Sequence, residues 1–238
     1  MRLFEKAVKL ISSAVDALVL LVCLMLMLLG IYSAADNMWV YASSKDSSLL
    51  AYRPELKEAV TEEKRISRDQ IGWIYVPGTG IDFPVLQGSD NTEYLNRDPY
   101  GEFSYSGSIF LDYRCSADLS DDYSVIYGHH MSGGHMFGCL DDYRDPRFFG
   151  EHRSGSFSTE EGSFELEVFA AFECLATEPE IFRPGGRSME KVRSFIMEKT
   201  GVEPDPQQRL LALTTCTANG DDTRLAVLAY IRPTEVED

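Results

Sequence analysis

The chain has 238 residues, of which 44% are hydrophobic, and its formal net charge is −16. This length and apolar content are enough for one domain with a hydrophobic core and an additional N-terminal segment. The acidic balance excludes a nucleic-acid partner, because binding to a phosphate backbone depends on clustered Lys and Arg side chains.

The first element is an unbroken apolar run over residues 17–32. With the small residues beside it, the run approaches the ~20 residues that a helix needs to cross a bilayer. Basic residues precede it, which favours a cytoplasmic N-terminus. The pattern predicts a single-pass membrane anchor over residues 1–35, with the rest of the chain outside the cell. A cleaved signal peptide is the alternative, because residues 33–35 are small, but the run is long for such a peptide.

A polar, Ser-rich stretch over residues 36–48 is typical of a linker. Residues 49–70 combine many charged side chains with spaced Leu, Ala and Val. This spacing indicates an N-terminal helical segment of one or two amphipathic helices. Pro54 is expected to begin one of them, because proline is favoured in the first turn of a helix.

Short β-like runs separated by Gly, Asp and Ser turns begin at Ile71. Pro84 within the second run indicates an edge or a bulge. The regular spacing predicts a mainly β domain over residues 71–233, a closed barrel or a sandwich, followed by an acidic tail at residues 234–238. About eight strands are expected, at residues 73–76, 81–86, 108–111, 123–127, 156–158, 164–172, 209–215 and 224–231.

Two helical pieces interrupt the strands. Residues 136–143 form a short one, and residues 188–199 a clearer one with an apolar stripe at helical spacing. Ser188 can cap the second helix and Gly201 can end it. This helix is therefore inserted directly before the strand that leads to Cys216.

Cys216 and Arg224 lie on either side of a short loop between two predicted strands. A thiolate is a strong nucleophile, and a nearby cation stabilises it. If the strands form a hairpin, Thr215 faces Arg224, and the guanidinium comes near the sulfur. Arginine remains charged and can stabilise the oxyanion of a tetrahedral intermediate. Each residue alone has an ordinary explanation, as a small buried side chain or a surface charge.

Two histidines directly follow Gly128 at the end of another β-like run. A histidine beside a cysteine can act as general acid for a leaving amine and as general base for an incoming one. This chemistry does not distinguish His129 from His130. His135 and His152 lie in loop-like sequence and are expected to be solvated.

The other cysteines do not indicate a metal or redox site. No CxxC pair is present, which disfavours a zinc cage or a redox dithiol. Cys23 lies in the apolar run, and the other three are expected to be small buried residues: Cys115, Cys139 and Cys174. No acidic pair lies in a calcium-loop pattern, and no cofactor is expected.

Four stretches of the chain resemble those of the sortases, membrane-anchored cysteine transpeptidases of Gram-positive bacteria, and of class B in particular. The resemblance covers about residues 71–231. The stretches are GWIYVPGT (72–79) with IDFPVLQG (81–88) and Asp90-Asn91, GSIFLDYR (107–114), YGHHM (127–131) with Met136-Phe137, and LTTC (213–216) with Arg224. One departure is Ala212, at the first position of the TLxTC motif.

The resemblance implies a closed sortase-type β-barrel of about eight strands with N-terminal helices and one helix inserted before the cysteine strand. It implies that Cys216 is the nucleophile and that His129, directly after the glycine, is the catalytic histidine. Arg224 becomes the oxyanion and substrate-orienting arginine, and Thr215 a substrate or oxyanion contact. The departure at Ala212 weakens inferences about the substrate pocket more than those about catalysis.

The implied function is a transpeptidase that cleaves a C-terminal sorting signal similar to NPQTN or PxTG through a thioacyl enzyme. An amine of a peptidoglycan stem or cross-bridge then resolves this intermediate and anchors the surface protein to the cell wall, without a cofactor. One alternative is a class C sortase that polymerises pilins, which the acidic end of the chain disfavours. The other is a non-enzymatic wall-binding β-barrel in which Cys216 is structural.

Overall fold

The computed structural model describes part of the chain in two units, Met1–Ala42 and Ser43–Asp238. For Cys216 it describes the backbone but not the side chain. The described residues are 1–44, 47–55, 59–186, 188–216 and 222–234.

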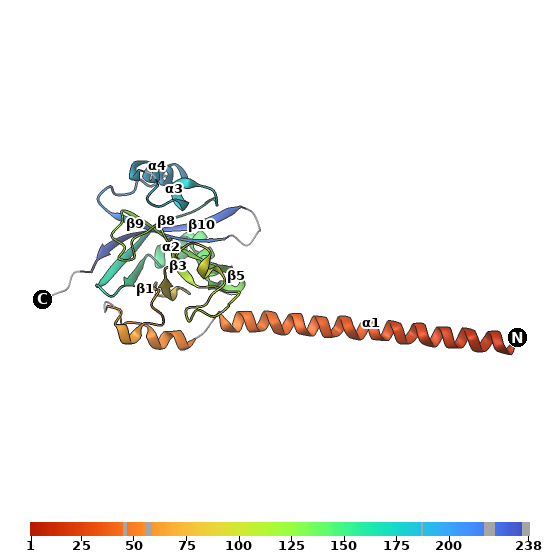
Figure 1. Cartoon of the computed structure of the whole chain (residues 1–238). Coiled ribbons are helices and arrows are strands. Elements are labelled where there is room, and N and C mark those ends of the chain that lie inside the picture. The colour runs from red at the N-terminus through yellow and green to blue at the C-terminus, as the bar shows by residue number, and fades with distance from the viewer. Residues whose placement is uncertain (45–46, 56–58, 187, 217–221, 235–238) are drawn as a thin grey trace. The chain divides into compact units, whose positions relative to one another are not determined.

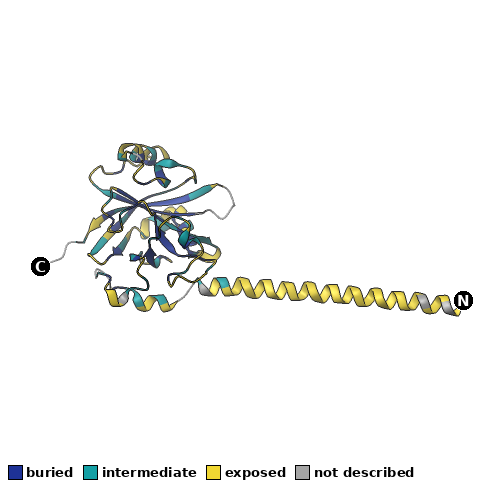
Figure 2. Cartoon of the chain, in the orientation of Figure 1, coloured by how far each residue is buried: buried dark blue, intermediate teal, exposed yellow. Residues whose placement is uncertain are grey.

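The first unit is formed by α1 (Arg2–Ser43), whose described side chains are exposed along most of its length (Figure 2). Among the described residues it is the one helix that is long and apolar enough to cross a membrane. It is compatible with the anchor predicted for residues 1–35. The helix continues into the predicted linker, because residues 36–43 are helical as well.

The second unit is a closed β-barrel with the strand order β1–β2–β3–β4–β9–β10–β8–β7, and β1 pairs with β7 to complete it (Figure 1). Closure confirms the predicted eight-stranded barrel and removes the free strand edges that an open sheet would expose. The strands are β1 (Gln70–Tyr75), β2 (Asp82–Leu86), β3 (Ile109–Leu111), β4 (Tyr123–Gly128), β7 (Ser154–Ser158), β8 (Ser163–Leu175), β9 (Arg209–Cys216) and β10 (Thr223–Pro233).

Strand β9 is buried on both faces. Leu211 and Leu213 pack into the barrel interior, whereas Leu210 and Ala212 pack under α4 (Met189–Thr200). Successive side chains of a strand point to opposite faces, so both sets of positions are apolar. The near-continuous apolar sequence of β9 therefore reflects a strand that is covered from two sides.

The inserted helix α4 is present as predicted, and it lies with the short helix α3 (Pro179–Phe182) on one side of the barrel (Figure 1). Val192 and Ile196 are buried against the barrel. Gly201 ends the helix with φ at 72°, a left-handed conformation that glycine adopts without strain. Ser188 occupies the N-cap position, but its side chain makes no capping hydrogen bond.

The described residues of the segment 49–70 do not form the expected amphipathic helices. The described part contains two short 3-10 helices, η1 (Ser47–Tyr52) and η2 (Glu62–Lys64), and Pro54 begins no helix there. Instead, Val60 is buried and its amide donates to the Thr159 carbonyl at 2.8 Å. Contacts with the barrel thus override the local helical pattern.

The connections between strands hold several short elements. The predicted helix at 136–143 is present as a 3-10 helix, η5 (Phe137–Arg144), which has tighter turns than an α-helix. Pro84 lies in β2 but is not paired with β3, because the pairing of these two strands begins at Val85. Elements without a strong sequence signal are η3 (Glu93–Leu95), β5 (His130–Met131), η4 (Ser132–Gly134), β6 (His135–Met136), α2 (Pro146–Glu151) and α3 (Pro179–Phe182).

Removing side-chain volume under α4 is expected to destabilise the barrel. Ile196 is fully buried in the cluster between α4 and the strands. We expect Ile196→Ala to lower the free energy of unfolding by about 2–5 kcal/mol, because the cavity cannot close completely. Lys191→Ala, on the exposed face of the same helix, is the control. Urea denaturation measures both, and an equal loss in the two variants would contradict this packing.

Candidate active site

Three adjacent strands bring the predicted site residues to one edge of the barrel. In the parallel ladder of β4 and β9, Gly128 lies opposite Thr215, so His129 leaves β4 level with Cys216. Strand β10 runs antiparallel to β9, and Arg224 lies directly opposite Cys216. The backbone thus places these residues together although His129 is distant in sequence.

The hairpin register differs by one residue from the expectation. Thr215 was expected to face Arg224, but it pairs with Leu225, and Cys216 itself pairs with Arg224. The loop length, which sets this register, could not be read from the sequence, because neither strand end carries a strong signal. The observed register brings the backbone of the predicted nucleophile and of the predicted arginine closer than expected.

A pocket of about 260 Å³ lies at this edge, and His129, Thr215 and Arg224 line it. The side chain of Cys216 lies outside the described part of the chain, but its backbone follows Thr215 directly. The other lining residues are largely apolar or aromatic. They are Asn91, Leu95, Phe110, Tyr127, Gly128, Ala176, Phe182 and Thr214.

His129 has one ring nitrogen engaged. Its Nε2 lies 2.7 Å from the Leu95 carbonyl oxygen. Because a carbonyl oxygen only accepts, Nε2 must carry the proton, and Nδ1 is left to give or take one. His130 instead contacts Asp141 Oδ2 through Nε2 at 2.7 Å and does not line the pocket. The geometry therefore distinguishes the two histidines that reaction chemistry alone left equivalent.

The other two histidines were expected to be solvated, but the structure covers part of each. His135 Nδ1 lies 2.7 Å from Ser44 Oγ. His152 Nδ1 lies 2.9 Å from the Phe148 carbonyl oxygen, and its ring stacks on the Phe148 ring. Both residues are half-buried. Loop-like sequence therefore did not predict solvent exposure here, because the loops pack on their own neighbours.

Gly128 allows the strand before His129 to pack closely. A Cβ atom at this position would lie 2.5 Å from Ile109 Cδ1 and 2.7 Å from the ring of Phe137. Both neighbours are almost completely buried, so they have little room to move. The glycine is therefore a packing requirement that fixes where the chain delivers His129.

Arg224 is the only Arg or Lys among the described residues that line the pocket. It is half-buried, and its Nη1 donates to the Thr223 carbonyl at 3.0 Å. A guanidinium has five N–H groups, so four of them take no part in that bond. Arg224 therefore supplies the positive potential of the pocket and can donate hydrogen bonds to an anionic group.

The three described cysteines of the second unit are buried, as the sequence predicted, whereas Cys23 in α1 is exposed. Burial raises the pKa of Cys115, Cys139 and Cys174 to about 12, so each remains a neutral thiol. Within the described residues, no three His, Cys, Asp or Glu side chains are grouped in a way that could hold a metal ion.

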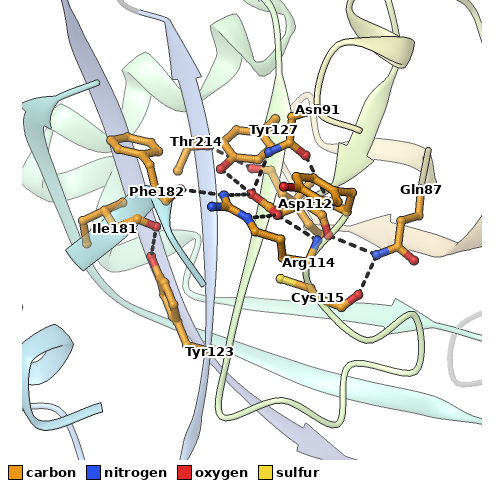
Figure 3. A network of polar contacts seen from close by, with 12 residues as sticks. Gln87, Asn91, Asp112, Arg114, Cys115, Tyr123, Tyr127, Ile181, Phe182 and Thr214 are labelled. Carbon is orange, nitrogen blue, oxygen red and sulfur yellow. Dashed lines mark hydrogen bonds and ion pairs between the residues drawn. The ribbon is translucent and has the colours of Figure 1, made fainter. Parts of the chain in front are cut away.

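A buried carboxylate beneath the pocket gathers several donors (Figure 3). The Asp112 side chain is fully buried. Arg114 donates to it through Nε at 2.8 Å and Nη2 at 2.6 Å, and through its backbone amide at 3.0 Å. Asn91 Nδ2 and Tyr127 OH donate to Oδ2 at 2.8 and 2.9 Å. Asn91 and Tyr127 also line the pocket.

These donors determine the charge state of the network. Burial acts to raise the pKa of Asp112, but the bonds from Arg114, Asn91 and Tyr127 outweigh it and hold that pKa below its ordinary value. Burial and the neighbouring Asp112 carboxylate raise the pKa of Tyr127. At neutral pH Asp112 is therefore ionised and Tyr127 remains a protonated donor.

Sequence reasoning assigned no role to Asp112 and Arg114. The available signal was a charged residue directly after a short apolar strand, with an opposite charge two residues later. Such a pair is usually a solvated turn, and only the fold shows that the carboxylate is covered. The pocket wall at Phe182 carried no signal, because the connection in which it lies has no regular pattern.

Comparison with known proteins gives consistent similarities. Residues 74–232 match the sortase domain family. Sortase B of Staphylococcus aureus is 31% identical over 177 residues, which cover 71% of this chain and 72% of the relative. A structure of S. aureus sortase B in complex with substrate has a TM-score of 0.65 at 29% identity, and the match covers 72% of this chain and 83% of that one.

A second solved structure is a class B sortase of Streptococcus pyogenes that is involved in pilus biogenesis. It is 35% identical with a TM-score of 0.64, and the match covers 70% of this chain and 94% of that one. Both matches are at least 29% identical and cover more than two thirds of this chain.

Gly128→Ala is expected to destabilise the barrel next to His129. The added methyl group overlaps Ile109 and Phe137, and such overpacking typically costs about 1–3 kcal/mol. Gly150→Ala is the matched control, since nothing lies within 4 Å of its added Cβ atom and Gly150 is in a helix. Thermal unfolding measures both. A Gly128→Ala variant as stable as Gly150→Ala would contradict the close approach.

Asp112→Asn is expected to change how stability depends on pH. Because the folded-state pKa of Asp112 is depressed, its contribution to stability is present above the ordinary value of about 4 and is lost as pH falls through the folded-state pKa. The wild-type chain should thus exceed Asp112→Asn in stability at pH 7, and the difference should shrink towards pH 3. Denaturation at both pH values measures it, and a constant difference would contradict the assignment.

Proposed function

Because the chain belongs to the sortase family, and within it to class B, we propose that it is a transpeptidase that works through a Cys216 thioacyl intermediate. It cleaves a C-terminal sorting signal and joins the surface protein to an amine of peptidoglycan. The observation that supports this most strongly is the strand register, which brings His129, Cys216 and Arg224 to one edge beside one pocket.

In the first half-reaction, Cys216 gives its thiol proton to Nδ1 of His129, and the resulting thiolate attacks the carbonyl carbon of a threonine in the sorting signal. The oxygen becomes an oxyanion, and the N–H groups of Arg224 stabilise it, with Thr215 as a further contact. The tetrahedral intermediate collapses, the peptide bond breaks, and His129 donates a proton through Nδ1 to the leaving amine. The products are a thioester on Cys216 and the released C-terminal peptide.

In the second half-reaction, His129 accepts a proton from the incoming amine through the same nitrogen, and the amine attacks the thioester. Arg224 stabilises the second oxyanion. When the carbon–sulfur bond breaks, the sulfur leaves as the thiolate and the surface protein carries a new amide bond. Neither half-reaction uses a cofactor, because the thiol, the imidazole and the guanidinium supply the nucleophile, the proton transfers and the charge stabilisation.

The pocket suits an extended peptide with a threonine near the scissile bond. Leu95, Phe110 and Phe182 offer apolar contacts, and Asn91 offers an amide for a polar side chain or the peptide backbone. These features agree with a signal similar to NPQTN or PxTG. The acceptor is an amine of a peptidoglycan stem or cross-bridge, which reaches the thioester from solvent.

Helix α1 gives the enzyme its location. Sortases are cell-surface enzymes, and α1 is compatible with a membrane anchor. We place the N-terminus in the cytoplasm, because basic residues precede the apolar run, and the barrel outside the cell. A barrel anchored in this way meets exported substrates at the membrane surface.

A second candidate acceptor follows from one similarity. The S. pyogenes relative is a class B sortase involved in pilus biogenesis, so a lysine side chain of another surface subunit is an alternative to a wall amine. This replaces the class C alternative, because the relatives reported above are class B. Mass spectrometry of the product formed in cells distinguishes a wall fragment from a joined subunit.

Cys216→Ala is expected to abolish both cleavage and transfer, because no other described cysteine reaches the pocket. Cys139→Ala is the control, since Cys139 is buried as a neutral thiol in η5 and does not line the pocket. Mass spectrometry of sorting-signal peptides, with and without wall amines, measures both. Peptide cleavage by folded Cys216→Ala would refute the thioacyl mechanism.

Arg224→Lys is expected to lower kcat about 10²–10³-fold, in the range for losing an oxyanion donor. Lysine keeps the charge but lacks the planar fork of N–H groups. Arg232→Lys, near the other end of β10, is the control for an arginine that lies outside this pocket. Steady-state kinetics on a cleavable peptide measures both, and near-normal kcat in Arg224→Lys would rule out the oxyanion role.

A further inference from the structure

We propose that the Asp112–Arg114 ion pair positions the wall of the peptide pocket that α3 forms. Neither residue lines the pocket, so both act through the residues that they hold. The inference rests on the proposed function only for the nature of the ligand, a sorting peptide. The positioning itself is a property of the fold and can be measured without substrate.

Three parts of the pocket wall meet at this ion pair (Figure 3). Asn91 comes from the connection between β2 and β3, and Tyr127 comes from β4; both donate to Asp112 Oδ2. Phe182 comes from α3, and its backbone oxygen accepts from Arg114 Nη2 at 2.8 Å. One carboxylate and one guanidinium therefore connect three segments that are separate in sequence.

Arg114 holds the end of α3 where the backbone needs a partner. The last carbonyl groups of a helix have no partner within the helix. Arg114 satisfies the carbonyl of Phe182, and Tyr123 OH donates to the carbonyl of Ile181 at 2.9 Å. The aromatic ring of Phe182 stacks on that of Tyr127 with centroids 6.5 Å apart. These contacts fix α3 against β4, and Phe182 becomes a side of the pocket.

The ion pair is more than a solvated surface contact. The Asp112 side chain is 0% exposed and that of Arg114 is 31% exposed. An exposed pair contributes little, but removing one partner of a buried charge leaves the other uncompensated. Asp112 therefore requires Arg114, and this requirement keeps the guanidinium in the orientation from which it also reaches Phe182.

Lysine cannot reproduce this arrangement. A guanidinium is planar and offers five donors in a fixed fork, so Arg114 bonds both oxygens of Asp112 and the Phe182 carbonyl together. A single ammonium group can balance the charge of Asp112 but cannot make all three contacts from one position. Arg114→Lys therefore keeps the charge and releases the wall, which separates positioning from charge compensation.

Peptide-cleavage kinetics with the full chain provide the first test. Since the pair holds the wall and does not touch the reacting atoms, we expect Arg114→Lys to raise KM roughly 10-fold and to leave kcat within about 3-fold. Arg153→Lys is the matched control, because Arg153 also bonds a backbone carbonyl and a carboxylate, those of Val168 and Glu167, away from the pocket. The control should leave both constants unchanged.

Hydrogen exchange provides a second test that needs no substrate. In Arg114→Lys, amide exchange in the segment 176–186 should rise roughly 10-fold, while amides of β9 keep their protection. A rise over the whole barrel, or no rise in this segment, would overturn the proposal. So would an unchanged KM, or a loss confined to kcat.

Two further outcomes are distinguishable. If Arg114→Lys does not fold, Tyr127→Phe removes one bond to Asp112, keeps the aromatic ring, and should raise KM roughly 2–5-fold; an unchanged KM would then overturn the proposal. If the wild-type chain cleaves no sorting peptide, the proposed function fails, whereas the exchange of segment 176–186 still decides whether Arg114 positions α3.

Discussion

The two-sided pairing of β9 is the constraint on which the rest of the site depends. A parallel ladder on one side sets the level at which His129 leaves β4, and an antiparallel ladder on the other sets Arg224 opposite Cys216. A slip of one residue in either ladder would turn every β9 side chain to the other face. Because both faces are buried in apolar clusters, the core itself fixes the register and so the geometry of the site.

Much of this arrangement could be predicted from local pattern. The eight strands, the helix α4 and the three buried cysteines followed from alternation, capping signals and residue type. The catalytic roles of the site residues come from a family resemblance and stay predictions. What local pattern could not provide was the hairpin register, which depends on the loop. It also could not show that residues 49–70 would pack as 3-10 turns, since tertiary contacts such as that of Val60 decide their conformation.

The pocket combines two kinds of surroundings for charge. Arg224 lies among the lining residues and can donate to a ligand, whereas Arg114 is engaged beneath the pocket with the fully buried Asp112. The first arginine suits a charge that develops during a reaction. The second belongs to a neutralised pair that orders the surrounding chain. Both residues are arginines, and the sequence alone does not distinguish them. They differ in their burial and in their hydrogen-bond partners.

The position of β9 and β10 within the barrel has a consequence for biogenesis. These strands are the last in the chain, yet they are inserted between β4 and β8. Until they emerge, β4 and β8 each present an unpaired edge, which is prone to association with other chains. A chain that emerges from its N-terminus therefore cannot close its barrel until β9 and β10 have followed. The predicted nucleophile, histidine and arginine therefore come together only when β9 and β10 have joined the barrel.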